Sequence, residues 1–273
     1  MDSTVSNSEQ IAVAIIPARY ASTRLPGKPL LPIAGKPLVL WVAERALSAR
    51  TVSRVIVATD DARIFDAVNS AGHEALMTRD DHASGTDRVA EVAHDLDADI
   101  IVNVQGDEPL IEPATIDRAV SALIADKEAQ MATTCESITE IADVLNRSVV
   151  KVVVDDRGYA VSFSRSPIPF PNQAVAEHGS IEAALRNPDA SGLLFSFRKH
   201  TGLYVYRREF LLEFTSWPQT ASERAESLEQ LRALERGVKI KVVEAVAPSI
   251  GVDTMEDLER VRAIVGRETP MAV

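Results

Sequence analysis

The 273-residue sequence contains only one cysteine, Cys135, so the chain can form neither an internal disulfide nor a cysteine-ligated zinc site. Long apolar runs are missing as well: Ile11–Ile16 spans only six residues, and a signal peptide or membrane helix needs more. The chain has fewer basic than acidic residues, with 29 Lys and Arg and 40 Asp and Glu, so its formal net charge is −11. Such a chain repels nucleic acid and anionic membrane surfaces overall. We therefore expect a cytoplasmic protein without nucleic-acid or membrane partners.

Hydrophobic residues make up 46% and charged residues 25% of the chain, which is typical of a packed globular protein and excludes disorder, collagen and a coiled-coil rod. Over the first half, short β-branched runs alternate with helical periodicity. They predict strands at 11–16, 55–59 and 100–104, and helices at 37–49, 61–71 and 85–96. This alternation favours a doubly wound α/β sheet whose ligand crevice lies beyond the carboxyl ends of the strands. An α+β domain with the same elements is the alternative.

After about residue 130 the pattern changes to strands separated by turns. The sequence predicts these strands at 131–135, 149–155, 159–164, 202–206 and 238–246. Residues 171–196 have no clear period, so we expect a surface excursion or lid there. One helix is predicted over 221–237, ending at a glycine, and another starts at Thr254–Asp257, which resembles a capping box with Asp in place of Glu. One compact unit with an inserted subdomain fits these elements best.

The stretch Pro17–Leu30 follows the first predicted strand, where doubly wound folds place phosphate-binding loops. From Gln10 to Ala43 the chain has no acid but contains four cations: Arg19, Arg24, Lys28 and Lys36. This segregation indicates a polyanionic ligand, because Arg chelates phosphate oxygens and Lys places a point charge on them. The loop is neither a Walker loop nor G-x-G-x-x-G, which argues against kinases and dehydrogenases. A solvated basic surface loop is the alternative interpretation.

Further motifs accompany this loop: Thr78–Arg88 (TRDDHASGTDR), Val104–Pro109 (VQGDEP), Phe163–Arg165, His200–Tyr206 (HTGLYVY), Glu223–Arg232 and Gly251–Thr254. Together they resemble the 3-deoxy-manno-octulosonate cytidylyltransferase (CMP-KDO synthetase) family over about residues 11–265. The resemblance implies a single Rossmann-like nucleotidyltransferase domain with a smaller inserted α+β subdomain for the sugar site and dimer contact. The nucleotide-binding core would comprise about 11–130 and 238–266, and the subdomain about 131–237. Residues 1–9 and 267–273 are expected to be flexible termini.

The same resemblance implies the reaction. The enzyme would transfer CMP from CTP to the 2-hydroxyl of 3-deoxy-D-manno-octulosonate (KDO), releasing pyrophosphate and activating KDO for lipopolysaccharide synthesis. A cytidylyltransferase for 8-amino-KDO or a related sugar acid is the alternative enzyme. A catalytically idle nucleotide-binding protein is the alternative of another class, although the presence of the cations and carboxylates argues against it. A homodimer is implied by the resemblance alone.

Candidate site residues also come from the resemblance. CTP would be bound by Arg19, Ser22, Lys28, Arg79, Ser84 and Gly85, and the catalytic residues would be Arg19, Lys28, Asp107 and Asp253. Asp107 and Asp253 would hold Mg²⁺, which takes one or two carboxylates beside phosphate oxygens. From spacing alone, an Asp at a strand end is often only a helix cap or turn former, and Ser84 equally suits the N-cap of the 85–96 helix.

The sugar acid would be bound by Gln105, Arg165, His200, Glu226 and Gln230. Arg165 is the candidate for a bidentate contact with the sugar carboxylate. Glu226 and Gln230 are four residues apart, so we expect them on one face of the predicted 221–237 helix, which could also be a solvated face.

Overall fold

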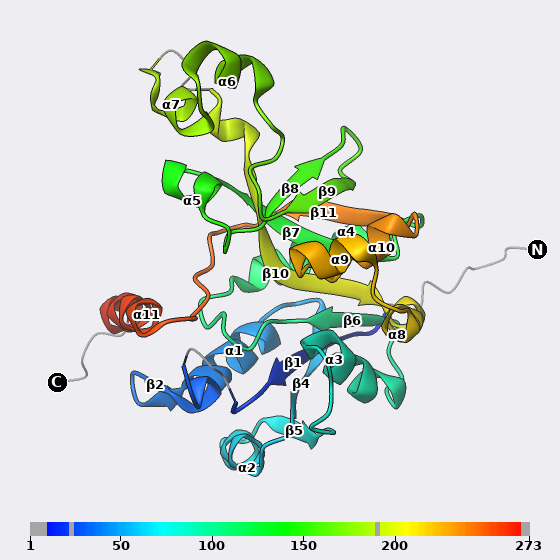
Figure 1. Cartoon of the computed structure of the whole chain (residues 1–273). Coiled ribbons are helices and arrows are strands. Elements are labelled where there is room, and N and C mark those ends of the chain that lie inside the picture. The colour runs from blue at the N-terminus through cyan, green and yellow to red at the C-terminus, as the bar shows by residue number, and fades with distance from the viewer. Residues whose placement is uncertain (1–9, 22–24, 189–191, 269–273) are drawn as a thin grey trace, which may run out of the picture. The chain divides into compact units, whose positions relative to one another are not determined.

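The computed structural model describes residues 10–21, 25–188 and 192–268, and the chain clusters into two compact units (Figure 1). The first unit runs to Pro113 and also includes Tyr206–Thr215 and the described chain from Ile250. The second unit comprises Ala114–Val205 and Ser216–Ser249. This division differs from the expected core and subdomain at 114–130, 206–215 and 238–249. Of the expected flexible termini, 1–9 and 269–273 lie outside the described residues.

A parallel sheet forms the centre of the first unit. Its strands are β1 (Ala12–Ala18), β4 (Val52–Thr59), β5 (Glu74–Met77) and β6 (Ile100–Asn103), in the spatial order β6-β1-β4-β5. All three strand pairs are parallel, which confirms the predicted α/β fold. From β1 the chain adds β4 and β5 on one side, and it then places β6 on the other side of β1. The strand order therefore reverses between β1 and β6. Doubly wound sheets bind ligands at such a point, beyond the carboxyl ends of the strands.

The strands read clearly in the sequence because both faces of the sheet are covered. Every residue of β6 is buried, and β1 is buried except at Pro17. The unit's helices are α1 (Leu38–Leu47), α2 (Ala62–Ser70), α3 (Gly85–His94), α8 (Arg208–Ser216) and α11 (Met255–Glu268). A short η1 (Lys28–Leu30) and the hairpin β2 (Pro32–Ile33) and β3 (Lys36–Pro37) follow β1. None of the described helices is long and apolar enough to cross a membrane.

The second unit contains a mixed sheet. Strands β7 (Met131–Ser137) and β11 (Ile240–Glu244) are parallel, and β7 also neighbours β10 (Arg198–Arg207). Strands β8 (Lys151–Val154) and β9 (Ala160–Ser164) add antiparallel pairs. The accompanying helices are α4 (Pro113–Ala125), α5 (Ile141–Leu145), α9 (Ala221–Glu226) and α10 (Gln230–Glu235).

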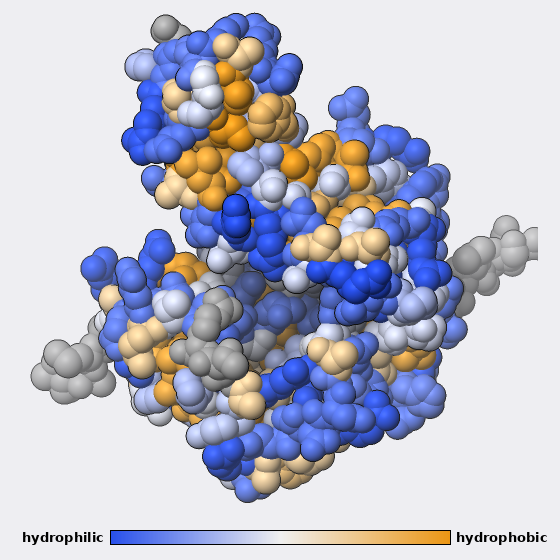
Figure 2. Space-filling model, viewed as in Figure 1, coloured by the Kyte–Doolittle hydropathy of each residue, from blue (hydrophilic) through white to orange (hydrophobic). Residues whose placement is uncertain are grey.

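The stretch 171–196 contains two short helices, α6 (Asn172–His178) and α7 (Ile181–Arg186), and the turn η3 (Leu194–Ser196). Leu185 of α7 packs with Ile138, Val144 and Phe197 in a hydrophobic cluster. In the space-filling view, hydrophobic residues lie among hydrophilic ones over α6 and α7 (Figure 2). Periodicity missed these helices because each is too short to establish a repeating apolar face.

The single helix predicted over 221–237 is wrong. A Thr220–Glu223 capping box starts α9, and Ser227 ends it in the left-handed conformation, at φ 52° and ψ 51°. Gln230 is then the first residue of α10. Glu226 and Gln230 therefore belong to different helices, so their spacing of four residues does not place them on one helical face. By contrast, the capping box predicted at the start of the last helix is confirmed, since Asp257 Oδ2 accepts from the Thr254 backbone N–H at 2.9 Å.

His200 of β10 lies in the core of the second unit and is 9% exposed. Its ring is edge-on to Phe163, with 5.1 Å between centroids, and tilted against Tyr204 at 5.3 Å. Burial disfavours the imidazolium and lowers the pKa of His200 from 6.5 to about 3. The ring is therefore neutral at physiological pH.

This buried imidazole makes stability fall in mild acid. The unfolded chain protonates His200 below about pH 6.5, whereas the native state keeps it neutral down to about pH 3, so the free energy of unfolding decreases as pH falls through that interval. Between pH 8 and pH 5.5 we expect His200 to account for a loss of about 1.4 kcal/mol. Urea unfolding of the wild type and His200→Gln at both pH values measures how much of the decrease in the free energy of unfolding comes from His200. An equal decrease in both proteins would contradict the expectation.

Gly106 marks a close approach between β1 and the segment that follows β6. A Cβ atom at this position would lie 2.8 Å from the backbone oxygen of Pro17. We expect Gly106→Ala to destabilise the fold by about 1–3 kcal/mol, because backbone must move to accept the methyl group. In the described part of the chain, no atom lies within 4 Å of a Cβ added at the exposed Gly251, so Gly251→Ala is the matched control. Chemical denaturation of the two variants should separate them, and equal midpoints would show that the approach is not restrictive.

Candidate active site

The basic loop after β1 is closed upon itself at Gly27. The Gly27 backbone N–H donates to the Tyr20 carbonyl at 3.0 Å, and Gly27 adopts φ 69°, in the left-handed region that glycine enters without steric cost. The Tyr20 ring would be 3.1 Å from a Cβ at Gly27, and the Arg63 guanidinium stacks on that ring at 3.3 Å. This closure fixes the chain where it enters η1 at Lys28. Ser22, predicted to bind CTP, lies outside the described residues.

The Lys28 ammonium lies between two carboxylates. Its Nζ is 2.7 Å from Asp107 Oδ2 and 3.2 Å from Asp253 Oδ1, and only 14% of the Lys28 side chain is exposed. Asp107 follows β6, as the sequence predicted. Asp253 does not directly follow a strand, because β11 ends at Glu244. It is placed instead by the neighbouring Val252 N–H, which donates to the Asp107 carbonyl at 2.8 Å. The structure thus brings together three predicted catalytic residues.

A cavity of about 260 Å³ lies beside this cluster. Lys28 and Asp107 line it together with three other predicted site residues: Arg19, Gly85 and Gln105. Gly106, next to Gln105, lines it as well. Gly85 starts α3, and a Cβ there would touch the Pro17 ring at 3.4 Å. The first residue of α3 therefore lies close to β1. The cavity therefore lies at the carboxyl ends of β1 and β6, where the strand order reverses.

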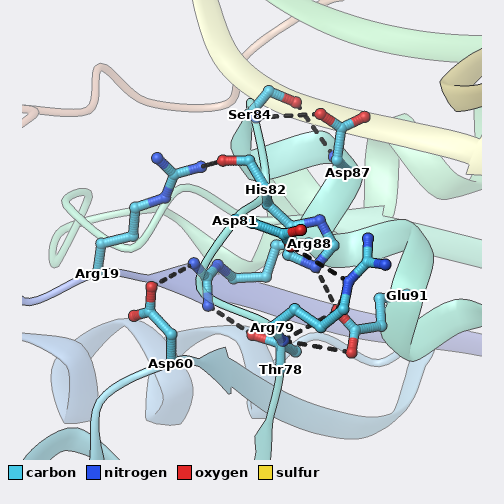
Figure 3. A network of polar contacts seen from close by, with 10 residues as sticks. All are labelled: Arg19, Asp60, Thr78, Arg79, Asp81, His82, Ser84, Asp87, Arg88 and Glu91. Atoms are coloured by element: carbon cyan, nitrogen blue, oxygen red, sulfur yellow. Dashed lines mark hydrogen bonds and ion pairs between the residues drawn. The ribbon is translucent and has the colours of Figure 1, made fainter.

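Arg19 is held by the backbone of the Thr78–Arg88 motif (Figure 3). Its Nη2 donates to the His82 carbonyl at 3.0 Å. The His82 side chain is 4% exposed and its Nε2 is bonded to the Glu91 carboxylate. Ser84 caps α3 by accepting from the Asp87 N–H at 3.1 Å, so the cap interpretation of Ser84 is confirmed. His82 and Glu91 were missed as supports, since no helical or strand spacing links residues nine apart across a loop.

Arg88 anchors the same motif from inside the first unit. Its side chain is fully buried, with Nη2 2.8 Å from Asp60 and Nη1 2.5 Å from Thr78 (Figure 3). A buried charge that lost its partner would cost several kcal/mol, so this pair holds the end of β4 to the motif. Arg79, predicted to bind CTP, has a side chain that is 68% exposed and lies 3.3 Å from Asp81. It lines a different cavity, of about 690 Å³, with α3 and α8.

Arg165, the candidate for the sugar carboxylate, follows β9 in the second unit. Its guanidinium donates to three backbone carbonyls: Glu226 at 2.7 Å, Arg147 at 3.1 Å and Ser227 at 3.3 Å. A guanidinium has five N–H groups, so two remain for a ligand. The Glu226 carboxylate accepts from Ser164 Oγ at 2.7 Å and from the Arg165 N–H at 3.0 Å. Glu226 thus supports Arg165 in this structure.

Gln230 and His200 are the other predicted sugar-binding residues in the second unit. Gln230 is 4% exposed, and its Nε2 is buried with no hydrogen-bond partner among the residues that the structure describes. Such an orphaned donor is rare in folded proteins and points to an acceptor supplied by a ligand or water. His200 Nε2 lies 2.8 Å from Thr133 Oγ1 on β7.

The comparisons with known proteins agree with the motifs. Residues 13–240 match the family model described as Cytidylyltransferase. A 3-deoxy-manno-octulosonate cytidylyltransferase from Trichlorobacter lovleyi is 53% identical over 92% of this chain and 96% of the relative. A 3-deoxy-manno-octulosonate cytidylyltransferase from Geobacter sulfurreducens is 55% identical over 91% of this chain and 96% of the relative. A solved structure of CMP:2-keto-3-deoxy-manno-octonic acid synthetase complexed with CTP has a TM-score of 0.84 and 45% identity, covering 95% of this chain and 100% of that one. The chain therefore belongs to the 3-deoxy-manno-octulosonate cytidylyltransferase family.

Proposed function

We propose that this protein transfers CMP from CTP to the 2-hydroxyl of KDO, giving CMP-KDO and pyrophosphate and so activating KDO for lipopolysaccharide synthesis. The observation that carries the proposal is the Lys28 ammonium between Asp107 and Asp253, beside a cavity at the reversal point of the sheet. Relatives that are 53% and 55% identical to it over the aligned residues are named for this reaction.

The residues proposed to bind the triphosphate lie in the first unit. In phosphoryl transfer the protein acts mainly by positioning the groups and stabilising charge. Arg19 and Lys28 come from an acid-free stretch and line one cavity, so they would bind the triphosphate and stabilise charge that develops on the α-phosphoryl and the leaving pyrophosphate. Arg19 keeps N–H groups for this contact, since Nη2 is the atom bonded to the His82 carbonyl.

The carboxylate pair fits Mg²⁺. Asp107 and Asp253 reach the same ammonium, so their oxygens converge on one position. Within the described ranges no group of three or more His, Cys, Asp and Glu could hold a metal ion, so a metal here would need oxygens from the substrate and water, as Mg²⁺ in nucleotide sites does. Asp107 and Asp253 would hold the ion, which when bound supplies positive charge to the phosphate oxygens.

The residues proposed to bind the sugar are Gln105 of the first unit and Arg165, His200, Glu226 and Gln230 of the second unit. Arg165 would use its two remaining N–H groups on the sugar carboxylate, with Glu226 holding the Arg165 backbone in place. Gln230 would donate its unpartnered amide to a sugar oxygen. These roles are part of the proposal, as is CTP binding by Ser84, Gly85 and Arg79.

A homodimer is also part of the proposal. Two large hydrophobic side chains next to or within 171–196 are exposed, Phe170 at 58% and Phe195 at 67%, and an interface between copies would bury such residues. Light scattering at several protein concentrations measures the oligomeric state, and a mass of one chain throughout would contradict this part.

The reaction is tested by pyrophosphate release from purified protein with CTP, KDO and Mg²⁺. We expect release with this combination, loss of release with EDTA, and much weaker release with the other nucleoside triphosphates. Substituting 8-amino-KDO in the same assay decides between the two acceptors. Tight CTP binding without any pyrophosphate release would leave the idle nucleotide-binding alternative.

Lys28 provides the sharpest mutational test. If its charge acts mainly on the transition state, Lys28→Ala and Lys28→Met should both lower kcat by roughly 10²–10³, the cost of removing one preorganised donor, with a smaller change in CTP affinity. Met keeps most of the bulk of the side chain, so equal damage would assign the loss to charge. Lys36→Met is the control, because Lys36 lies in the same acid-free stretch but pairs with Glu44 and stacks on Trp41. A kcat within about threefold of wild type for both Lys28 variants would refute the role.

A further inference from the structure

The Thr133 hydroxyl on β7 sits between two partners from β10. Its Oγ1 is 2.7 Å from the Leu203 carbonyl oxygen and 2.8 Å from His200 Nε2, and Thr133 is fully buried. A carbonyl oxygen can only accept, so the single hydroxyl proton of Thr133 is directed to Leu203. The bond to His200 then requires that Nε2 carries the proton and that Thr133 Oγ1 accepts it.

The other ring nitrogen of His200 is consequently a bare acceptor. The ring is neutral at physiological pH and holds one N–H, which the Thr133 contact places on Nε2. Among the described residues no group is hydrogen-bonded to Nδ1. This atom is also absent from the few side-chain atoms that are both sealed from solvent and unpartnered, namely Gln10 Oε1, Arg88 Nε, Gln230 Nε2 and Ser249 Oγ. Nδ1 is therefore an acceptor without a partner among the described residues, and it is not fully sealed from solvent.

We propose that Thr133 is a positioning residue that fixes His200 as the Nε2–H tautomer, so that the sugar site offers a hydrogen-bond acceptor at Nδ1. This inference rests on the proposed function, because the ligand is the sugar acid. An acceptor recognises a hydroxyl donor and repels a carboxylate, whose oxygens only accept. His200 would thus accept a hydrogen bond from a hydroxyl of the sugar, and the sugar carboxylate would be left to Arg165, a cation of the same unit.

The tautomer can be tested without any substrate. Long-range ¹H–¹⁵N NMR of histidine-labelled enzyme at pH 7 distinguishes a protonated ring nitrogen from a bare one. We expect His200 to show a protonated Nε2 and a bare Nδ1 in the wild type and in Thr133→Ser, which keeps the hydroxyl. A protonated Nδ1 or a charged ring in the wild type overturns the proposal. Because this readout needs no turnover, it stands or falls separately from the proposed reaction.

Kinetics then tests the effect on the sugar. Thr133→Val removes the hydroxyl at nearly constant volume and should raise the KM for KDO by about fivefold or more, the usual weight of one lost hydrogen bond, with the KM for CTP within about twofold. Thr133→Ser should restore the wild-type KM for KDO. Thr134→Val is the matched control, since Thr134 is the adjacent buried hydroxyl of β7 and pairs with Thr201 instead of His200.

Two kinetic outcomes would overturn the assignment. One is an unchanged KM for KDO in a folded Thr133→Val enzyme. The other is an equal increase in Thr134→Val, which would show a general loss of core packing. If Thr133→Val fails to fold by circular dichroism, the wild-type and Thr133→Ser spectra still decide the tautomer.

Discussion

The attraction between one ammonium and two carboxylates joins three parts of the first unit. Lys28 arrives from the loop after β1, Asp107 from the end of β6 and Asp253 from the segment before α11. Without the ammonium, the two carboxylates would face each other with like charge in a partly buried place. The close approach of Gly106 to Pro17 and the Val252–Asp107 backbone bond serve the same arrangement, because they bring the three chain segments within reach of one another.

A second lysine organises the other unit in a different way. Lys151 is fully buried, and its Nζ donates to the carbonyls of Asn146, Val149 and Arg165 at 2.8–3.0 Å. Burial lowers the pKa of Lys151, since desolvation disfavours the ammonium. All three of its N–H groups are spent on backbone, so this cation is structural and holds Arg165 in place. Lys28 pairs with side-chain carboxylates at a cavity, where a polyanion can compete for it. The contrast separates a supporting cation, Lys151, from the cation that is proposed to bind the substrate, Lys28.

Much of this could be predicted from the sequence, and the failures have physical reasons. Buried parallel strands read as continuous apolar runs, so β1, β4 and β6 were found, and with them the position of Asp107. Lys28 was found because it is one of four cations in a stretch without any acidic residue, which indicated a polyanionic ligand. The break at Ser227 was missed because a left-handed serine carries no sequence signal and the helical pattern continues past it. The Thr133–His200 bond was missed because pairing between strands distant in sequence depends on register, which local patterns do not encode.

The separation of the charged partners along the chain bears on how the enzyme folds. Lys28 and Asp107 are 79 positions apart, but Lys28 and Asp253 are 225 apart. In the unfolded chain, closing the longer loop costs about 0.9 kcal/mol more in entropy than closing the shorter one, and contacts of such high order form slowly. The carboxylate pair is thus completed only when distant segments have docked. A ligand that needs both carboxylates would stabilise the whole first unit against unfolding, and would not bind a partly folded intermediate that lacks the later segment.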